Sequence, residues 1–403
     1  MQFPAASAWS LAVLFAILSR MRSWQAFSLC VWLSLPTHAL SPQADRKIIE
    51  GLDAGYSLNF EHAASLFEEA NQLAPQHPAG PFFLASLQWF EYSQNADIPG
   101  TIDALEPKFN RNINEAFNRA QKMYRQNPKD PEANFYLGAA YGMKGRWLLL
   151  KRHWIRAAHN GYKGYKYLKR TIELDPNLYD AYLGLGMYDY YSDTLPGILK
   201  FASRLIVRGD KKRGLRYINL TIEKGHYSVT EAKLFLAAVE AAYEHEPQKA
   251  LLIIRELKAE KHDNLFFNLM EVGFLSDAKD WSGAIALGEP LVYKVWDVPY
   301  AKPHASLFDL YLGDAYLGAK DYGKAIEIFN RCIEIAPDPR KASVTFCYLR
   351  RAQAYDLMGN RGQAIEDYRS VKARPDFFDS QAKARQGLKG PATYDQVLSQ
   401  LLE

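Results

Sequence analysis

The spacing of small and large side chains between Ser306 and Pro339 constrains the fold of this chain more than any other feature. Numbered from Ser306 as position 1, small residues stand at positions 8, 20 and 27, and large ones at positions 7, 11 and 24. A proline at position 32 cannot continue a helix. The spacing predicts two antiparallel helices, because small residues let the backbones approach and large residues fill the remaining space. The residues concerned are Leu312, Gly313, Tyr316, Ala325, Phe329, Cys332 and Pro337.

This pattern resembles the tetratricopeptide repeat, a helix-turn-helix unit of 34 residues. One such unit cannot bury its own apolar face and must stack on neighbours. The resemblance implies an all-α fold, a right-handed superhelical array of about eight antiparallel helix pairs over residues 40–376. Residues 377–403 are expected to form a C-terminal capping helix or two, interrupted at Pro391. The other units begin near Ala44, Pro78, Pro131, Asn177, Glu231, Leu265 and Thr345.

Three consecutive units, the second to the fourth, are longer than the others. In each, the small residue expected at position 20 comes late, at Ala116, Gly164 and Gly214. The extra residues fall between the first helix (A) and the second helix (B), over 97–115, 145–163 and 190–213. Such junctions project from one edge of a stacked array, so we expect the insertions to gather in one protruding surface, the inserted edge.

The inserted edge is basic and aromatic. Nine Lys or Arg and no Asp or Glu lie between Lys144 and Arg170. This composition favours an anionic partner, either an acidic protein segment or an anionic membrane surface, while solvated basic faces over core aromatics remain the alternative. An amphipathic helix over 195–208 would add a basic face. The candidate binding residues are Arg146, Lys151, Arg152, Trp154, Arg156, Lys163, Lys200, Arg204, Arg208, Lys211, Lys212 and Arg213.

A second resemblance covers part of the same region. Gly184-Leu185-Gly186-Met187, Tyr190-Tyr191, Leu195-Pro196 and the run from Gly209 to Leu215 are similar to a segment of bacterial tetratricopeptide repeat proteins of unknown role. The segment is also distantly similar to the eukaryotic inclusion-body-clearance family of such proteins. What this resemblance implies is a scaffold rather than an enzyme.

The N-terminal residues have the pattern of a secretory signal peptide when they are read from Met21. Arg22 supplies the charge, Ala26–Leu35 the apolar run, and Thr37-His38-Ala39 the cleavage site. We expect residues 1–39 to be a signal peptide and Met21 to be the true start; an uncleaved anchor is the alternative. The mature chain would then be periplasmic or secreted in a bacterium. Cys332 and Cys347 would lie near each other in an oxidising compartment, paired or as free thiols.

We expect no catalytic, cofactor or metal site. The run Glu244-His245-Glu246 is the best local cluster, but three adjacent residues on a helix cannot all face one ion. The helix A positions that would hold a C-terminal carboxylate lack the required Lys and Asn. The concave groove is expected to be apolar apart from Asp314, Gln353 and Asp356, which suits an apolar or extended peptide or another helix.

These observations predict a non-enzymatic, exported scaffold for protein–protein interaction in the cell envelope, without a cofactor. The partner would be a protein or peptide, acidic if it binds the inserted edge. The alternative is a peripheral membrane protein that binds anionic lipid through residues 144–216. The net charge of +4 is too small to indicate nucleic acid, which is not an expected partner.

Overall fold

The computed structural model describes residues 40–95, 100–151, 153–194, 209–260, 264–299 and 301–402. Within these ranges the regular secondary structure is entirely helical and contains no strand, which confirms the all-α prediction. The expected signal peptide at 1–39 lies outside the described residues, as do Arg152, Lys200, Arg204 and Arg208. No helix in the described ranges is long and apolar enough to cross a membrane.

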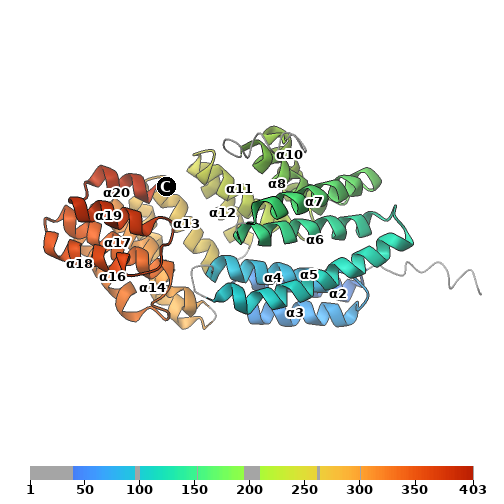
Figure 1. Cartoon of the computed structure of the whole chain (residues 1–403), viewed down its shortest axis with the longest axis horizontal. Coiled ribbons are helices and arrows are strands. Elements are labelled where there is room, and N and C mark those ends of the chain that lie inside the picture. Colours follow the sequence, from blue (N-terminus) through green and yellow to red (C-terminus); the bar gives the residue numbers. More distant parts are fainter. Residues whose placement is uncertain are drawn as a thin grey trace, which may run out of the picture. The chain divides into compact units, whose positions relative to one another are not determined.

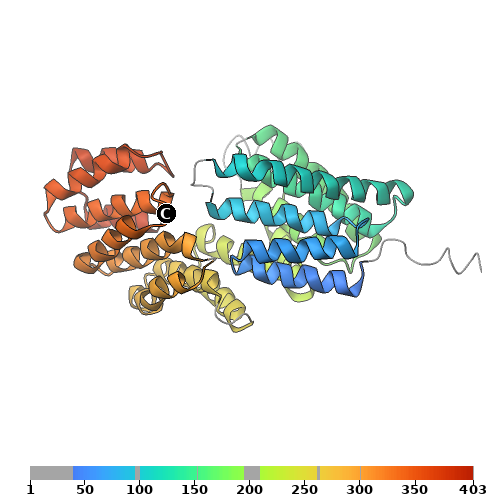
Figure 2. The same cartoon turned by 90° about the horizontal axis from the view of Figure 1, so that it is seen from below.

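Eight antiparallel helix pairs follow one another along the described chain (Figure 1, Figure 2). The two helices of each pair pack together, and the second packs on the first helix of the next pair, which confirms the superhelical array. A 3-10 turn, η1 (Lys302–His304), precedes the seventh pair. The pairs are α2 (Pro42–Tyr56) with α3 (Phe60–Leu73), α4 (Ala79–Asn95) with α5 (Thr101–Gln126), α6 (Pro131–Leu150) with α7 (Trp154–Leu174), α8 (Asp180–Thr194) with α10 (Lys211–Lys224), α11 (Val229–Ala242) with α12 (Pro247–Glu260), α13 (Leu265–Asp277) with α14 (Trp281–Asp297), α15 (Ala305–Gly318) with α16 (Tyr322–Ile335), and α17 (Ala342–Leu357) with α18 (Arg361–Lys372).

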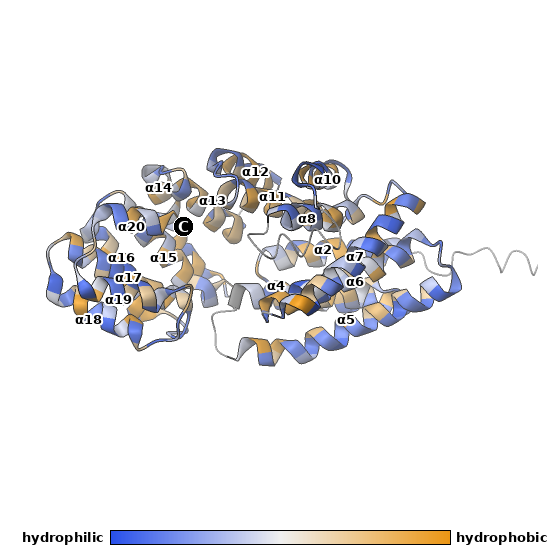
Figure 3. Ribbon diagram, turned by 45° about the horizontal axis from the view of Figure 1, so that its top comes forward, coloured by the Kyte–Doolittle hydropathy of each residue, from blue (hydrophilic) through white to orange (hydrophobic). Residues whose placement is uncertain are grey.

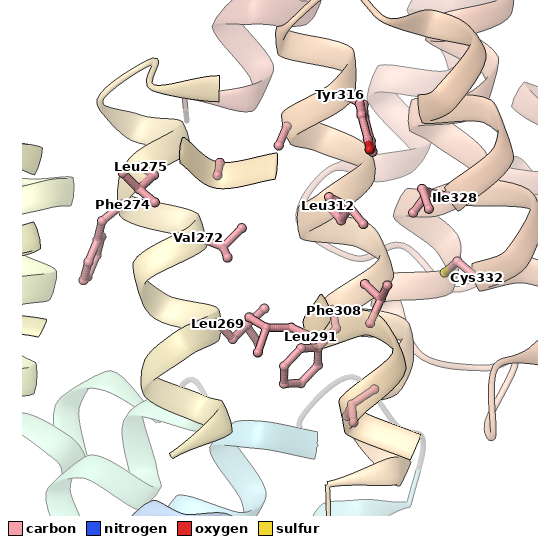
Figure 4. Packing of buried hydrophobic residues seen from close by; sticks show 14 of the residues in the cluster. Leu269, Val272, Phe274, Leu275, Leu291, Phe308, Leu312, Tyr316, Ile328 and Cys332 are labelled. Carbon is pink, nitrogen blue, oxygen red and sulfur yellow. The ribbon is translucent and has the colours of Figure 1, made fainter. Parts of the chain in front are cut away.

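Close packing inside each pair follows the small-and-large pattern of the sequence. A methyl group on Gly313 of α15 would overlap the ring of Phe329 on α16, and Gly51 meets Phe67 in the same way in the first pair. Between pairs, apolar side chains of successive A helices meet. Figure 4 shows Val272 of α13 directed towards the α15 side chains that continue this core. The spacing therefore fixes both the distance between paired helices and the face that each buries.

Short turns connect helices A and B in the units of ordinary length. Lys320 takes a left-handed backbone conformation with φ of 65°, and the carboxylate of Asp321 then accepts a hydrogen bond from the Lys324 backbone N–H. Lys279 and Asp280 repeat this arrangement at the start of α14. The Asp side chain satisfies one of the N–H groups that a helix start leaves without a partner.

The first two insertions add helical turns rather than loops. α5 has 26 residues, α6 has 20 and α7 has 21, whereas α16 has 14. Figure 3 shows α5 with separate hydrophilic and hydrophobic sides. The two extensions lie side by side as expected, because the rings of Phe109 and Trp147 stack with centroids 4.0 Å apart. Most of the third insertion lies outside the described residues, so its place on this edge stays a prediction.

Two further helices follow the eighth pair. α19 (Ser380–Lys389) continues the stack and packs on α17 and α18. α20 (Tyr394–Leu401) does not continue the stack but returns to contact α15 of the preceding pair. Pro391 lies between the two helices.

Candidate functional site

Several cations of the inserted edge are paired with carboxylates of other helices. The Arg146 guanidinium donates a 2.6 Å hydrogen bond to Glu231 and lies 3.6 Å above the ring of Trp89. The Lys151 ammonium donates to Glu106 at 2.7 Å. This hydrogen bond is the main reason why the pKa of Glu106 is lowered. Arg146 thus links the third helix pair to the second and the fifth, and Lys151 links the third pair to the second, so each cation has a structural function. Binding of a partner by either cation stays a prediction.

The basic run at the start of α10 is also engaged within the chain. Arg213 makes two hydrogen bonds, of 2.6 and 2.7 Å, to the fully buried carboxylate of Asp189. Lys211 donates at 2.5 Å to Glu244, which also accepts a hydrogen bond from Tyr190. Lys212 is exposed. The segment of the second resemblance therefore joins α8 to α10 and α11, and binding by its cations stays a prediction.

The remaining candidate residues lie on α7. Arg156 and Trp154 are exposed in its first turn, and Lys163 lies over the ring of Tyr141 at 5.3 Å. Sequence reasoning missed Ile155, which has the most exposed large apolar side chain within the described ranges. The adjacent Trp154-Ile155 pair in a basic run is a signal that could have indicated it.

The early A helices contact the fifth and sixth pairs directly. Asp45 of α2 accepts hydrogen bonds from the Tyr227 hydroxyl and the ring of His226, and the rings of Phe90 and Phe266 meet edge to face. The Asn264 side-chain amide donates to the Tyr56 carbonyl. The inner face that we expected to form an open apolar groove is filled in this part of the chain by its own side chains.

A half-open cavity of about 230 Å³ lies among the starts of the A helices. The Asp180 carboxylate at its wall accepts hydrogen bonds from three backbone N–H groups, those of His226, Tyr227 and Ser228. Glu132, on another wall, pairs with His77. These carboxylates are engaged in holding helix starts. Within the described ranges, no group of His, Cys, Asp and Glu has a metal-binding arrangement.

The inner face of the seventh and eighth pairs is occupied by α20. We define the α15/α17 face by Asp314, Arg350, Gln353 and Asp356. Its polar groups contact the backbone of the C-terminal segment: Arg350 donates to the Gln400 carbonyl at 2.7 Å, and Asp356 accepts from the Ala392 N–H at 2.9 Å.

Side chains complete this contact. The Gln353 amide donates to the Gln400 side-chain oxygen at 2.7 Å. The Tyr394 hydroxyl donates to the Gly318 carbonyl at 2.6 Å, and Val397 of α20 is fully buried. Of the three polar residues expected in the groove, Gln353 contacts α20 and Asp356 contacts the residue stretch just before it, whereas Asp314 is engaged by Arg350.

Burial raises the pKa values of two aspartates on α15. It raises the pKa of Asp314 to about 6, although Arg350, whose Nε lies 3.3 Å away, acts in the opposite direction. Burial also raises the pKa of Asp309, which lies five residues earlier on α15 beside Arg331 of α16, to about 7 against the opposing effect of that arginine. The sequence analysis missed Arg350, although its position one turn before Gln353 on the same helix could have indicated it.

The fold defines a helical-repeat protein, a class whose stacked units present extended binding surfaces. The family model described as tetratricopeptide repeat matches residues 312–339, the unit in which the spacing is clearest, so the chain contains a tetratricopeptide repeat there. Repeats of this kind generally mediate contacts with proteins or peptides and are generally not catalytic. No curated protein matches the sequence.

Solved structures give a distant likeness. The yeast Tom70 crystal structure is 12% identical with a TM-score of 0.42, covering 82% of this chain and 85% of that chain. A human IFIT1 dimer with m7Gppp-AAAA is 12% identical with a TM-score of 0.44, covering 90% and 88%. The P58(IPK) TPR domain is 14% identical with a TM-score of 0.23, covering 89% and 98%. Likenesses at this level carry nothing about function.

Proposed function

We propose that this chain is an exported, non-enzymatic scaffold that binds a helical segment of a protein partner on the α15/α17 face. The observation that supports this function is the way in which α20 packs on this face. Arg350 and Asp356 bind main-chain atoms of the C-terminal segment, and one apolar side chain, Val397, is fully buried. A short helix that offers a free carbonyl near its end and one apolar anchor has the same chemistry.

The partner and α20 would compete for the same face. α20 has only eight residues and follows α19 after the stretch 390–393. A tethered segment of this kind has a high effective concentration, so it weakens the apparent affinity of any partner presented from solution. The chain would therefore bind its partner most strongly when α20 is displaced.

The cell envelope is the proposed compartment. Two observations support it: the signal-peptide pattern of residues 1–39, and a disulfide between Cys332 and Cys347, whose Cα atoms are 6.6 Å apart. Disulfides persist in oxidising compartments such as the periplasm. Cell fractionation with an antibody against the chain tests this part, and recovery only from the reducing cytosol would contradict it.

A labelled peptide of residues 391–402 tests the binding site directly. In the full chain with Val397→Asp, the buried anchor becomes a charge and α20 should leave its seat. We expect this variant to bind the peptide in a fluorescence anisotropy titration, and the unaltered chain to bind it at least tenfold more weakly. Ser399→Asp adds the same charge on the exposed side of α20 and should behave as the unaltered chain does.

Hydrogen exchange separates the outcomes of this titration. If the amides of α20 exchange freely in Val397→Asp and the peptide still does not bind, the α15/α17 face is not a helix-binding site and the proposal fails. Adding Arg350→Ala to Val397→Asp should remove peptide binding, because the guanidinium that holds the helix carbonyl is then lost. Binding that survives this double change would contradict the proposed geometry.

A further inference from the structure

The large apolar side chains at the junction of α6 and α7 are unusually exposed. Ile155 has 88% of its surface exposed, Trp154 53% and Leu149 46%. We call Leu149, Trp154, Ile155 and Arg156 the α6–α7 tip. Leu149 lies in the last turn of α6 and the other three in the first turn of α7. Isolated exposed apolar residues are common, but three at one helix junction point to a binding surface.

The segment that runs through this tip carries charge of one sign. No Asp or Glu occurs from Lys144 to Ile172. Glu106 of the neighbouring α5 is neutralised by Lys151. Lys166 and Lys169 are exposed on α7, eleven and fourteen residues beyond Ile155. Within the described residues no ion pair involves either lysine or Arg156, although the adjacent Arg170 pairs with Glu173. The tip therefore presents exposed apolar side chains beside Arg156, and α7 continues from it with two further cations that have no carboxylate partner in the described fold.

The shape of the tip favours a lipid surface over a protein groove. Its apolar side chains project from the end of a helical hairpin, and they do not line the cavity at the starts of the A helices. Projecting side chains need a surface that can deform around them, which the headgroup region of a bilayer does. Tryptophan prefers this region because its ring is apolar and its N–H is polar, and nearby Lys and Arg are attracted by anionic lipid.

We infer that the α6–α7 tip inserts Trp154 and Ile155 into the interface of an anionic membrane, with Arg156, Lys166 and Lys169 supplying electrostatic attraction. This inference does not depend on the α15/α17 face. It places the membrane contact on the described hairpin end, whereas the sequence analysis spread it over residues 144–216.

Vesicle flotation with the full chain tests the inference. Vesicles of phosphatidylglycerol and phosphatidylcholine in equal amounts should bind the chain, and vesicles of phosphatidylcholine alone should bind it at least tenfold more weakly. Ile155→Ser should weaken binding to the anionic vesicles at least tenfold, because the apolar side chain that would be buried is lost. Leu252→Ser changes another exposed apolar residue, on α12, and should leave binding unchanged.

The charges are tested by a matched pair of double variants. Lys166→Glu with Lys169→Glu should reduce binding to the anionic vesicles at least tenfold. Arg385→Glu with Lys389→Glu places the same charge change on the exposed side of α19 and should have little effect. If both double variants weaken binding equally, the membrane responds only to the net charge of the chain, and the role of the tip is contradicted.

A second readout isolates the tip from any other membrane contact of the full chain. Brominated phosphatidylcholine mixed into the anionic vesicles quenches only tryptophans that reach the lipid. The quenching of the unaltered chain should exceed that of Trp154→Phe, because the difference reports the inserted indole. Equal quenching would overturn the inference.

Discussion

The Arg350 guanidinium on α17 donates a 2.7 Å hydrogen bond to the backbone carbonyl of Gln400 on α20, fifty residues further along the chain. The same guanidinium donates to the Gln353 side chain at 3.1 Å and lies beside Asp314. One buried cation thus connects the C-terminal helix to the inner faces of two successive pairs.

Arg350→Ala should loosen α20 selectively. Hydrogen bonds from charged groups contribute about 1.5–3 kcal/mol, so the amides of α20 should exchange roughly tenfold faster or more. The substitution also removes the partner of Asp314 and so lowers the stability of the fold in general. The exchange of α18 amides in the same variant measures this general effect and serves as the reference. Arg385→Ala, an exposed arginine on α19, is the control. Unchanged protection of α20 would show that Arg350 does not hold it.

The pair formed by Arg213 and Asp189 predicts a different result for the basic run of α10. Arg213→Ala leaves a fully buried carboxylate without its partner and should lower the free energy of unfolding by about 3–5 kcal/mol. Lys212→Ala, at the adjacent exposed position, should change it by less than about 0.5 kcal/mol. Urea denaturation measures both values. Equal losses would mean that Arg213 acts as a surface charge.

Asp309 predicts how stability depends on pH. Burial raises its pKa from 3.8 to about 7, so the folded chain holds a proton that the unfolded chain releases between these values. The contribution of this group to stability therefore falls as the pH rises from about 4 to about 7, by at most about 4 kcal/mol. Asp309→Asn should flatten this dependence in urea titrations at several pH values. Asp395→Asn, at an exposed position on α20, is the control and should keep the pH dependence of the unaltered chain. If the stability of Asp309→Asn falls with pH as steeply as that of the unaltered chain, the raised pKa does not belong to Asp309.

The hairpin array could be predicted from the sequence because its determinants are local. Gly313 and Phe329 stand sixteen positions apart and meet across one turn, so their spacing specifies how α15 and α16 pack. The same logic located the enlarged units. It did not show that the extra residues of α5, α6 and α7 are helical, because a late second helix is equally consistent with a long loop.

The candidate site was harder to predict because its contacts are distant in sequence. Arg146 and Glu231 are 85 residues apart, so the basic run gave no sign that a carboxylate of another pair lies beside it. The contact of α20 with the α15/α17 face likewise depends on residues that are far apart in sequence, Arg350 and Gln400. Ile155 was missed for a different reason: an apolar residue in a helix is usually taken as core, and only the structure shows which side of α7 it occupies.

Removing the disulfide provides the last prediction. The bond joins α16 to α17 across a separation of 15 residues and lies in the shared core, where both cysteines are fully buried. Closing a loop of this length removes freedom from the unfolded chain, so changing both Cys332 and Cys347 to Ala should lower the free energy of unfolding by about 3 kcal/mol. Reduction with dithiothreitol should destabilise the unaltered chain similarly and leave the double variant unaffected.

Mass spectrometry after alkylation in denaturant, without reductant, shows whether the bond is present. Two alkylated thiols in chain isolated from the envelope would contradict both the bond and the support it lends to export.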